Sequence, residues 1–363
     1  TRLDFKISDD LTAILAGGFS RFNELSITGI GYYQIENWTT SYLQGRLIYK
    51  DLFAQAFINR SNAGDTFNLR TGELVVDRSI QFVSQVQHAT TLFEGRQHFT
   101  YGLDLLFTRP ESEGTLYGRN EDDDHIDEVG YYLQSETELS QKFKFLATGR
   151  VDHNNRLPEL VFSPRAALVF KPADNHTARL TFNRAFETPS TTNQFLDLNV
   201  APATDANPYA VRIIGVPTKT GFTFRRDQNG GLDGLYMHSP FTSDEDGGRA
   251  AALPVDATEQ WGAIVAIMGA AEIDLSEVPV PGPDEVATTL RELNIRTGVF
   301  EQIKASSIAD IRPLESLVTT TYEAGYKGIL NKNLFLTAGL YYEQNTNFAT
   351  PNIVTASVFF DST

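Results

Sequence analysis

Two adjacent segments decide the fold of this chain: EVGYYLQSETEL (Glu128–Leu139) and KFKFLATGRVD (Lys142–Asp152). In both, side chains of opposite character alternate, so that Tyr131 and Leu133 fall on one side of a strand and Gln134 on the other. Two more segments of this kind follow directly. Strands of about ten residues with one apolar and one polar face are what a transmembrane β-barrel uses to cross an apolar band of ~25 Å.

Short and long connections alternate between the predicted strands. The short turns lie at Ser8–Asp10, Lys50–Asp51, Glu94–Gly95, Ser140–Gln141, Pro172–Asn175 and Asn331–Asn333. The long loops occupy Ser20–Trp38, Arg60–Asp77, Pro110–Asp127, His153–Phe162, Glu187–Pro313 and Asn345–Asn352. A bacterial outer-membrane barrel has short periplasmic turns at one rim and long extracellular loops at the other. The alternation therefore favours such a barrel over a β-sandwich, whose Greek-key connections are not sorted in this way.

We therefore expect an all-β, antiparallel transmembrane barrel with about fourteen strands in this chain. The segment Glu187–Pro313 is too long for a simple loop in a compact domain, and we expect it to fold on itself as a partly helical extracellular cap. Its apolar run Trp261–Ala271 is too short to span a membrane, and Pro283 opens a predicted short helix that ends at Leu293. A last strand is predicted from Val354 onward.

The composition excludes several functional classes. The chain has 363 residues, of which 41% are hydrophobic, and no apolar run is long enough for a membrane-spanning helix. A formal net charge of −16 argues against a nucleic-acid partner, because a phosphate backbone requires a basic surface. Cysteine is absent, which rules out disulfides and cysteine-based metal sites. The first residues lack the features of a signal peptide, so we expect a mature or partial chain.

Several short motifs carry a family resemblance. They are GYYLQSE (130–136), GRVD (149–152), SPRAA (163–167), NRAFETPS (183–190), YEAGYKG (322–328) and LYY (340–342). Each motif is weak alone, but together and in this order they resemble the β-barrel domain of TonB-dependent outer-membrane receptors. The likeness is good over residues 99–198 and 314–347, looser over 1–98, and absent over 200–313.

This resemblance implies a barrel of about 22 strands whose lumen is closed by an N-terminal plug domain. Such receptors bind scarce substrates, including metal chelates, cobalamin and oligosaccharides, and release them inward when the inner-membrane TonB complex pulls on the plug. Compared with this pattern, we expect the chain to lack the plug, the TonB-contacting segment and about eight strands of the barrel. We therefore expect residues 1–363 to be part of a barrel domain, with 187–313 as an extracellular cap, and the alternative is a fourteen-stranded barrel that closes by itself.

One group of polar side chains falls on the predicted lumen face. Its members are Arg150, Arg165, Arg179, Asn183, Glu136 and Glu138. One interpretation makes them a substrate-lining or plug-docking surface, and the alternative is a charge-paired wall that only keeps the lumen wet. Arg184 breaks the alternation, since its parity places it on the lipid side. Near the outer rim it is expected to snorkel to lipid phosphates.

The acidic loop before these strands is a weak candidate for a cation site. The run EDDDHIDE (Glu121–Glu128) gathers six carboxylates and one histidine. Oxygen ligands suit calcium, and the candidate ligands are Asp122, Asp123, Asp124 and Asp127. The loop lacks the glycine and the ligand spacing of an EF-hand, so a solvated acidic run is the alternative. Apart from this structural calcium, no cofactor is predicted.

The sequence predicts binding and transport rather than catalysis. It contains none of the common motifs for nucleophilic, metal-dependent or nucleotide-dependent enzymes, and its six histidines are scattered. The leading hypothesis is an integral protein of the bacterial outer membrane that takes up a scarce substrate by TonB-coupled transport. A structural barrel whose large outer loop serves adhesion or complex assembly, without transport, is the alternative, and a soluble β-rich secreted binder is a third. The predicted partners are outer-membrane lipid, the TonB complex through a plug, an unidentified extracellular substrate, and a surface lipoprotein or larger membrane assembly.

Overall fold

The computed structural model describes residues 1–28, 31–201, 209–221, 223–226, 235–238, 251–253, 265, 269, 274–275, 290–294, 299–303, 310–331, 333–347 and 358–359. Long antiparallel strands build its main sheet. They are β1 (Arg2–Lys6), β2 (Leu11–Thr28), β3 (Gly31–Tyr49), β4 (Leu52–Asn62), β6 (Ile80–Leu92), β7 (Gln97–Arg109), β8 (Ile126–Glu138), β9 (Phe143–Asn154), β10 (Val161–Ala173), β11 (His176–Glu187), β19 (Leu317–Leu330) and β20 (Leu334–Thr346). The short β5 (Phe67–Asn68) pairs with β3 beside this path. The sheet therefore has 13 strands, against about fourteen predicted barrel strands.

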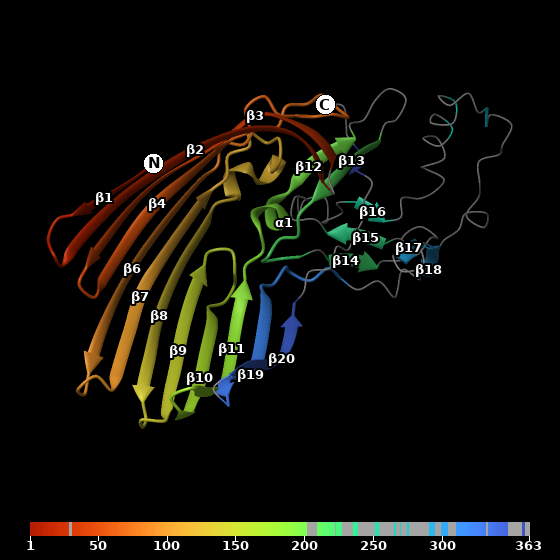
Figure 1. Ribbon diagram of the computed structural model, residues 1–363. Helices are drawn as coiled ribbons and strands as arrows, with labels where there is room; N and C mark the ends of the chain where they lie inside the picture. The colour runs from red at the N-terminus through yellow and green to blue at the C-terminus, as the bar shows by residue number, and fades with distance from the viewer. Residues whose placement is uncertain are drawn as a thin grey trace.

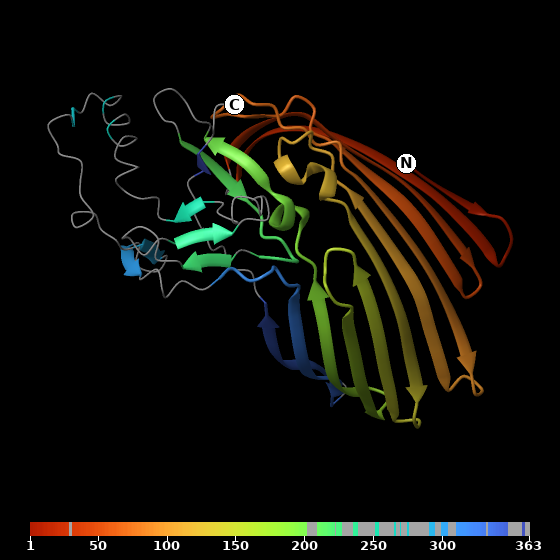
Figure 2. The ribbon, with the colours of Figure 1, turned by 180° about the vertical axis from the view of Figure 1, so that it is seen from behind.

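Neighbours in this sheet follow one another along the chain, except that β11 pairs with β19 across the long insertion. Figure 1 and Figure 2 show a single, strongly curved layer with β1 at one edge and β20 at the other. Every long strand pairs antiparallel with its neighbours, as the alternation of the sequence predicts. The described part of the chain forms a curved wall that does not close on itself.

The register divides the wall into a polar face and an apolar face. One row across β4, β6, β7, β8 and β9 reads Gln55, Gln85, Asp104, Gly130 and Asp152. The next row, whose side chains point to the opposite face, reads Ala54, Val86, Leu103, Tyr131 and Val151. Many large apolar side chains on that second face remain exposed. A wall with one wet face and one apolar face matches the predicted transmembrane strands.

Short and long connections lie at opposite ends of the strands (Figure 1). At the end called the short-turn rim, Lys50 and Asn331 take left-handed φ values of 50° and 51°, which tight reversals require. At the other end, called the long-loop rim, lie the loop between β7 and β8 and the insertion between β11 and β19. The two-way sorting of connections that the sequence predicts is therefore present.

Two predicted loops are shorter than expected. The predicted loop Ser20–Trp38 is wrong, because β2 continues to Thr28 and β3 already begins at Gly31. The loop predicted over His153–Phe162 shrinks to residues 155–160, because β9 and β10 extend into it from both sides.

A β-bulge explains why the outer part of β2 and β3 escaped the period-two pattern. The paired residues change from Phe22 and Trp38 to Glu24 and Ile35, so that one strand advances by two residues and the other by three. Asn37 lies in the longer step with a left-handed φ of 59°, which asparagine tolerates better than most residues. The bulge reverses the parity of β3, and the alternation breaks there.

Within its described residues, the insertion between β11 and β19 contains the short helix α1 and several short strands. They are α1 (Thr191–Phe195), β12 (Asp197–Ala201), β13 (Tyr209–Ile214), β14 (Thr223–Arg226), β15 (Leu235–His238), β16 (Ala251–Leu253), β17 (Leu290–Asn294) and β18 (Val299–Ile303). These strands form small sheets of their own, separate from the main sheet. Figures 1 and 2 both place α1 and β12 at the long-loop rim.

Two predictions about the cap and the chain end need correction. The predicted helix Pro283–Leu293 is wrong at its end, since Leu290 begins β17, which pairs with β18; its earlier part lies outside the described residues. Of the apolar run Trp261–Ala271, the described residues Val265 and Gly269 are helical. The last strand predicted from Val354 is described only as β21 (Val358–Phe359), which pairs with β13 rather than with the main sheet.

Buried apolar side chains gather at the long-loop rim rather than within the wall. Tyr117, Ile126 and Phe195 form the buried cluster, with Leu116 packed against it. A one-layer wall has no hydrophobic core of its own, so its apolar face must be covered by another medium. Among the residues that the structure describes, no helix is long and apolar enough to cross a membrane.

Candidate functional site

Arg150 is the most connected charged residue of the polar face. Its Nε donates to both carboxylate oxygens of Asp152, at 2.9 Å each. Its Nη1 donates to Asp104, which lies two strands away on β7. The guanidinium also lies 5.9 Å from the centroid of the Tyr132 ring. One arginine thus connects β7 and β9 across the face of β8.

Gly130 allows this crossing. It stands between Asp104 and Asp152 in their common row, on the strand that Arg150 passes over. A Cβ at this position would collide with the Arg150 guanidinium and with the Asp152 carboxylate. Glycine thus lets these side chains approach the backbone closely, and a larger residue would displace them.

The two predicted glutamates lie lower on the same face, near the short-turn rim. Lys144 makes an ion pair with Glu136 and lies directly opposite Glu138 in the register of β8 and β9. This group is half-exposed, so its electrostatic contribution to stability is small. It is a separate cluster from the one around Arg150.

The remaining predicted lumen residues lie on β10 and β11. Arg165 and Asn183 face each other directly across these strands. Arg179 makes an ion pair with Glu323 on β19. All six predicted residues thus share the polar face, in distinct groups along it, and a substrate-lining or plug-docking role for them stays a prediction.

The four predicted calcium ligands engage different groups. Asp123 pairs with Arg156 at 3.0 Å, and Asp127 pairs with Arg109 at 2.6 Å. Asp122 is exposed, whereas Asp124 is only 4% exposed. Within the described ranges, no group of three or more histidine or carboxylate side chains is arranged to hold a metal ion. Calcium binding by this loop stays a prediction.

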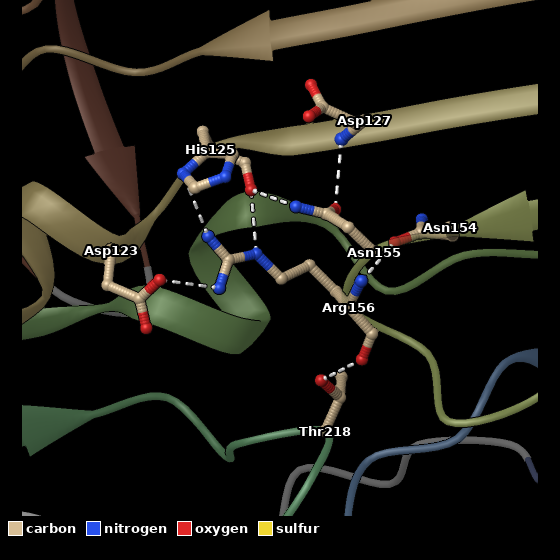
Figure 3. Close-up of polar contacts among 7 residues, drawn as sticks. All are labelled: Asp123, His125, Asp127, Asn154, Asn155, Arg156 and Thr218. Atoms are coloured by element: carbon tan, nitrogen blue, oxygen red, sulfur yellow. Dashed lines mark hydrogen bonds and ion pairs between the residues drawn. The ribbon is translucent and has the colours of Figure 1, made fainter.

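Arg156, between β9 and β10, is 5% exposed, and its side chain points toward Asp123 and His125 (Figure 3). Its guanidinium donates to the carbonyl oxygen of His125 at 2.7 Å, to Oδ1 of Asp123 at 3.0 Å, and to Nδ1 of His125 at 3.3 Å. It also lies 4.9 Å from the ring centroid of Phe195 in α1. Its carbonyl oxygen accepts from the Thr218 hydroxyl at 2.5 Å. We call Asp123, His125, Arg156, Phe195 and Thr218 the rim clasp.

A second group of contacts joins the loop after β7 to the first part of the insertion. Arg119 reaches the buried Asp197 through Nε at 2.8 Å, Nη2 at 3.0 Å and its backbone N–H at 2.9 Å. Asn120 Nδ2 donates to the Phe195 carbonyl oxygen at 2.8 Å, and the Tyr117 and Phe195 rings meet edge to face at 6.5 Å. Multidentate arginine contacts and buried aromatic rings are strong individual interactions. The loop after β7 and the first part of the insertion are therefore fixed to each other.

Asp124 lies beside the rim clasp in an unusual state. Its Oδ2 atom is buried and has no hydrogen-bond partner among the described residues. Burial, aided by the nearby Glu121 carboxylate, raises the pKa of Asp124 to about 7, although Arg156 acts in the opposite direction. A substantial fraction of Asp124 is therefore protonated near neutral pH.

Sequence reasoning missed several residues of these networks. Asp104 lies in a predicted strand with the correct parity, so its membership of the polar face was detectable. The ion pair of Asp104 with Arg150 was not detectable, because the two residues lie on strands that are not neighbours. Arg156 and Thr218 lie in irregular segments where no periodicity marks them. Only the folded rim brings them together.

The fold and these networks define a class of protein. A one-layer antiparallel sheet with an apolar face and a charged, hydrogen-bonded face is the wall of a membrane-spanning β-barrel, because only closed pairing satisfies a backbone in lipid. Short turns at one rim and long loops at the other are the bacterial outer-membrane arrangement.

Comparisons with known proteins identify the family. The family description "TonB dependent receptor-like, beta-barrel" matches residues 2–234, and the chain belongs to this family. Its members are integral proteins of the bacterial outer membrane and are receptors and transporters, not enzymes, which confirms the predicted family, location and non-enzymatic class. Comparison with curated proteins found no match.

Solved structures share the fold at low sequence identity. The siderophore receptor PirA from Pseudomonas aeruginosa is 11% identical, with a TM-score of 0.50 over 95% of this chain and 55% of that one. A mutant of the ferric enterobactin receptor PfeA from Pseudomonas aeruginosa is 12% identical, with a TM-score of 0.50 over 95% of this chain and 41% of that one. The chain thus spans about half the length of these relatives.

Proposed function

We propose that this chain is the wall of a receptor that takes up a scarce extracellular substrate by TonB-coupled transport. The main observation behind this proposal is the curved sheet with one polar and one apolar face, in a chain of this family. A polar, charge-paired inner surface supports a wet lumen through which a hydrophilic substrate moves. In the complete protein, we propose that a plug domain closes this lumen and contacts the inner-membrane TonB complex.

The anchored long-loop rim also supports a receptor role. The rim clasp and the pair of Arg119 with Asp197 fix the start of the insertion against the loop after β7. A pre-organised rim lowers the entropic cost of binding a ligand from outside. The substrate classes named for the family are metal chelates, vitamins and oligosaccharides. By their names, one solved relative is a siderophore receptor and the other is a ferric enterobactin receptor.

Uptake measurements test this proposal. We would delete the gene, and separately the tonB gene, and measure uptake of labelled ferric chelates, cobalamin and neutral oligosaccharides by intact cells. Loss of uptake of one class in both deletions is the expected result. Uptake that persists without TonB, or that a protonophore leaves unchanged, would contradict coupled transport. In that case the structural or adhesion barrel becomes the better interpretation.

A further inference from the structure

A pocket of about 600 Å³ opens on the wall, and residues of β2, β3, β4, β6 and β7 line it. One row of the register crosses it from β2 to β7 and reads Gly18, Tyr42, Asn59, Gln81 and Thr108. The row belongs to the polar face, because Tyr42 and Asn59 share the parity of Arg46 and Gln55, which hydrogen-bond each other there. The pocket therefore faces the lumen.

The aromatic ring of Tyr42 lines this pocket on the polar face. The Tyr42 ring lies over the backbone of Gly18, where a Cβ would collide with it, and Tyr42 nevertheless remains 46% exposed. Beyond it, the Trp38 indole donates from Nε1 to the Ser61 hydroxyl at 3.1 Å. Trp38 also stacks on Phe22, with ring centroids 6.2 Å apart. Glycine 18 is thus the reason that a tyrosine face lies open toward the lumen.

The polar groups of the pocket are neutral hydroxyls and amides. Those on the polar face are Ser20, Thr40, Tyr42, Asn59, Ser61, Gln81 and Thr108. The one charged lining residue, Arg60, is next to Asn59 on the strand and so has the parity of the apolar face. Each of the neutral hydroxyl and amide side chains can both donate and accept a hydrogen bond.

We propose that this pocket binds a neutral saccharide. The hydroxyls of a sugar ring both donate and accept hydrogen bonds, which matches a lining of neutral hydroxyl and amide groups. The C–H groups of its apolar side suit the negative face of an aromatic ring such as that of Tyr42. A ferric chelate with net negative charge would need cationic side chains here, and the lining on the polar face supplies none among the described residues. The inference rests on the proposed receptor function and narrows its substrate.

Binding to the full-length receptor in detergent tests the proposal. We would titrate maltohexaose, cellohexaose, mannohexaose and galactohexaose by calorimetry, with a ferric catecholate chelate and cobalamin as comparison probes. At least one hexasaccharide is expected to bind, with roughly tenfold weaker affinity after Tyr42→Ala or Gln81→Leu. Gln85→Leu is the matched control, because Gln85 lies on the same strand and the same face as Gln81 but does not line the pocket. It should leave the affinity within about twofold.

The outcomes separate this proposal from the proposed function. Failure of all four hexasaccharides to bind would overturn the saccharide site, as would binding that neither Tyr42→Ala nor Gln81→Leu weakens. If a ferric chelate is taken up with TonB and no saccharide binds, the transport proposal stands and this one fails. If a saccharide binds through Tyr42 but TonB does not drive its uptake, the saccharide site stands and the transport proposal fails. Heat-modifiable migration on gels verifies that each variant is folded.

Discussion

Arg150 on β9 and Asp104 on β7 form an ion pair that passes over the strand between them. In a flat sheet such a contact would be hindered by the side chain of the intervening strand. Here that position is Gly130, so a charged link adds to the backbone pairing of three strands. The half-buried position of Arg150 makes the link stronger than an exposed pair.

The first prediction concerns Gly130. Replacing it with alanine places a Cβ against the guanidinium of Arg150 and the carboxylate of Asp152, so the network must shift. We expect Gly130→Ala to destabilise the barrel by about 1–3 kcal/mol. Urea unfolding of the receptor in lipid vesicles, followed by the gel shift of folded barrels, measures the loss.

Gly45→Ala is the matched control for this prediction. Gly45 also lies within a long strand of the wall, but a Cβ there meets nothing within 4 Å. The control is expected to be neutral or slightly stabilising, because alanine has less conformational freedom than glycine in the unfolded chain. Equal losses for the two variants would contradict a specific role for Gly130.

The second prediction concerns the rim clasp. Arg156→Ala removes the guanidinium contacts to Asp123, His125 and Phe195. The carbonyl oxygen of His125 then keeps only its longer hydrogen bond from Asn155, at 3.3 Å. We expect the free energy of local opening of the rim to fall by about 2–4 kcal/mol. Hydrogen exchange should become faster by at least tenfold over 110–127 and 191–198, while the middle of the wall stays protected.

Arg78→Ala is the control for the clasp. Arg78 also belongs to the long-loop rim and pairs with Glu113, but both side chains are at least half exposed. An exposed pair contributes about 0–1 kcal/mol, so exchange should change little. If Arg78→Ala and Arg156→Ala open the rim equally, the burial of Arg156 is not what holds the rim together.

Sequence reasoning recovered the wall because each strand carries a local, period-two signal. The parity of Tyr131 against Gln134, and the side of Arg184, follow from that signal and agree with the register. The pattern failed in β3, where the bulge at Asn37 reverses parity, and at the long-loop rim. Contacts such as Arg156 with Thr218 join residues far apart in the chain, and no local pattern encodes them.

The third prediction is a pH dependence at Asp124. Burial raises its pKa in the folded protein to about 7, above the value near 4 of an exposed aspartate. The protonated form is therefore the one that the fold favours. The rim should be most stable below about pH 4 and lose stability as the pH rises through about 7, by about 1–3 kcal/mol.

Asp124→Asn tests this dependence, because the amide keeps the shape of the protonated acid. The variant should hold the loop 110–127 closed at pH 8 as well as at pH 5, measured by hydrogen exchange corrected for intrinsic rates. The wild-type protein should open more at pH 8. EDTA in all samples removes any contribution from calcium. A pH dependence that survives in Asp124→Asn would assign it to another group.

The last prediction uses the apolar face to locate the membrane. Leu180 and Arg184 lie on this face of β11, four residues apart, with Arg184 nearer the long-loop rim. At ~3.3 Å per residue, this separation moves a side chain by roughly 13 Å along the strand. An arginine at the middle of a bilayer costs about 2–4 kcal/mol on a barrel surface, whereas one near the interface costs about 0–1 kcal/mol.

Leu180→Arg should therefore destabilise the folded receptor strongly in vesicles, and Arg184→Leu should change its stability by less than about 1 kcal/mol. In detergent micelles, which adapt to charge more easily than a bilayer, the difference should shrink. A small effect of Leu180→Arg in vesicles would mean that this part of β11 does not face lipid, and that the insertion or another chain covers it.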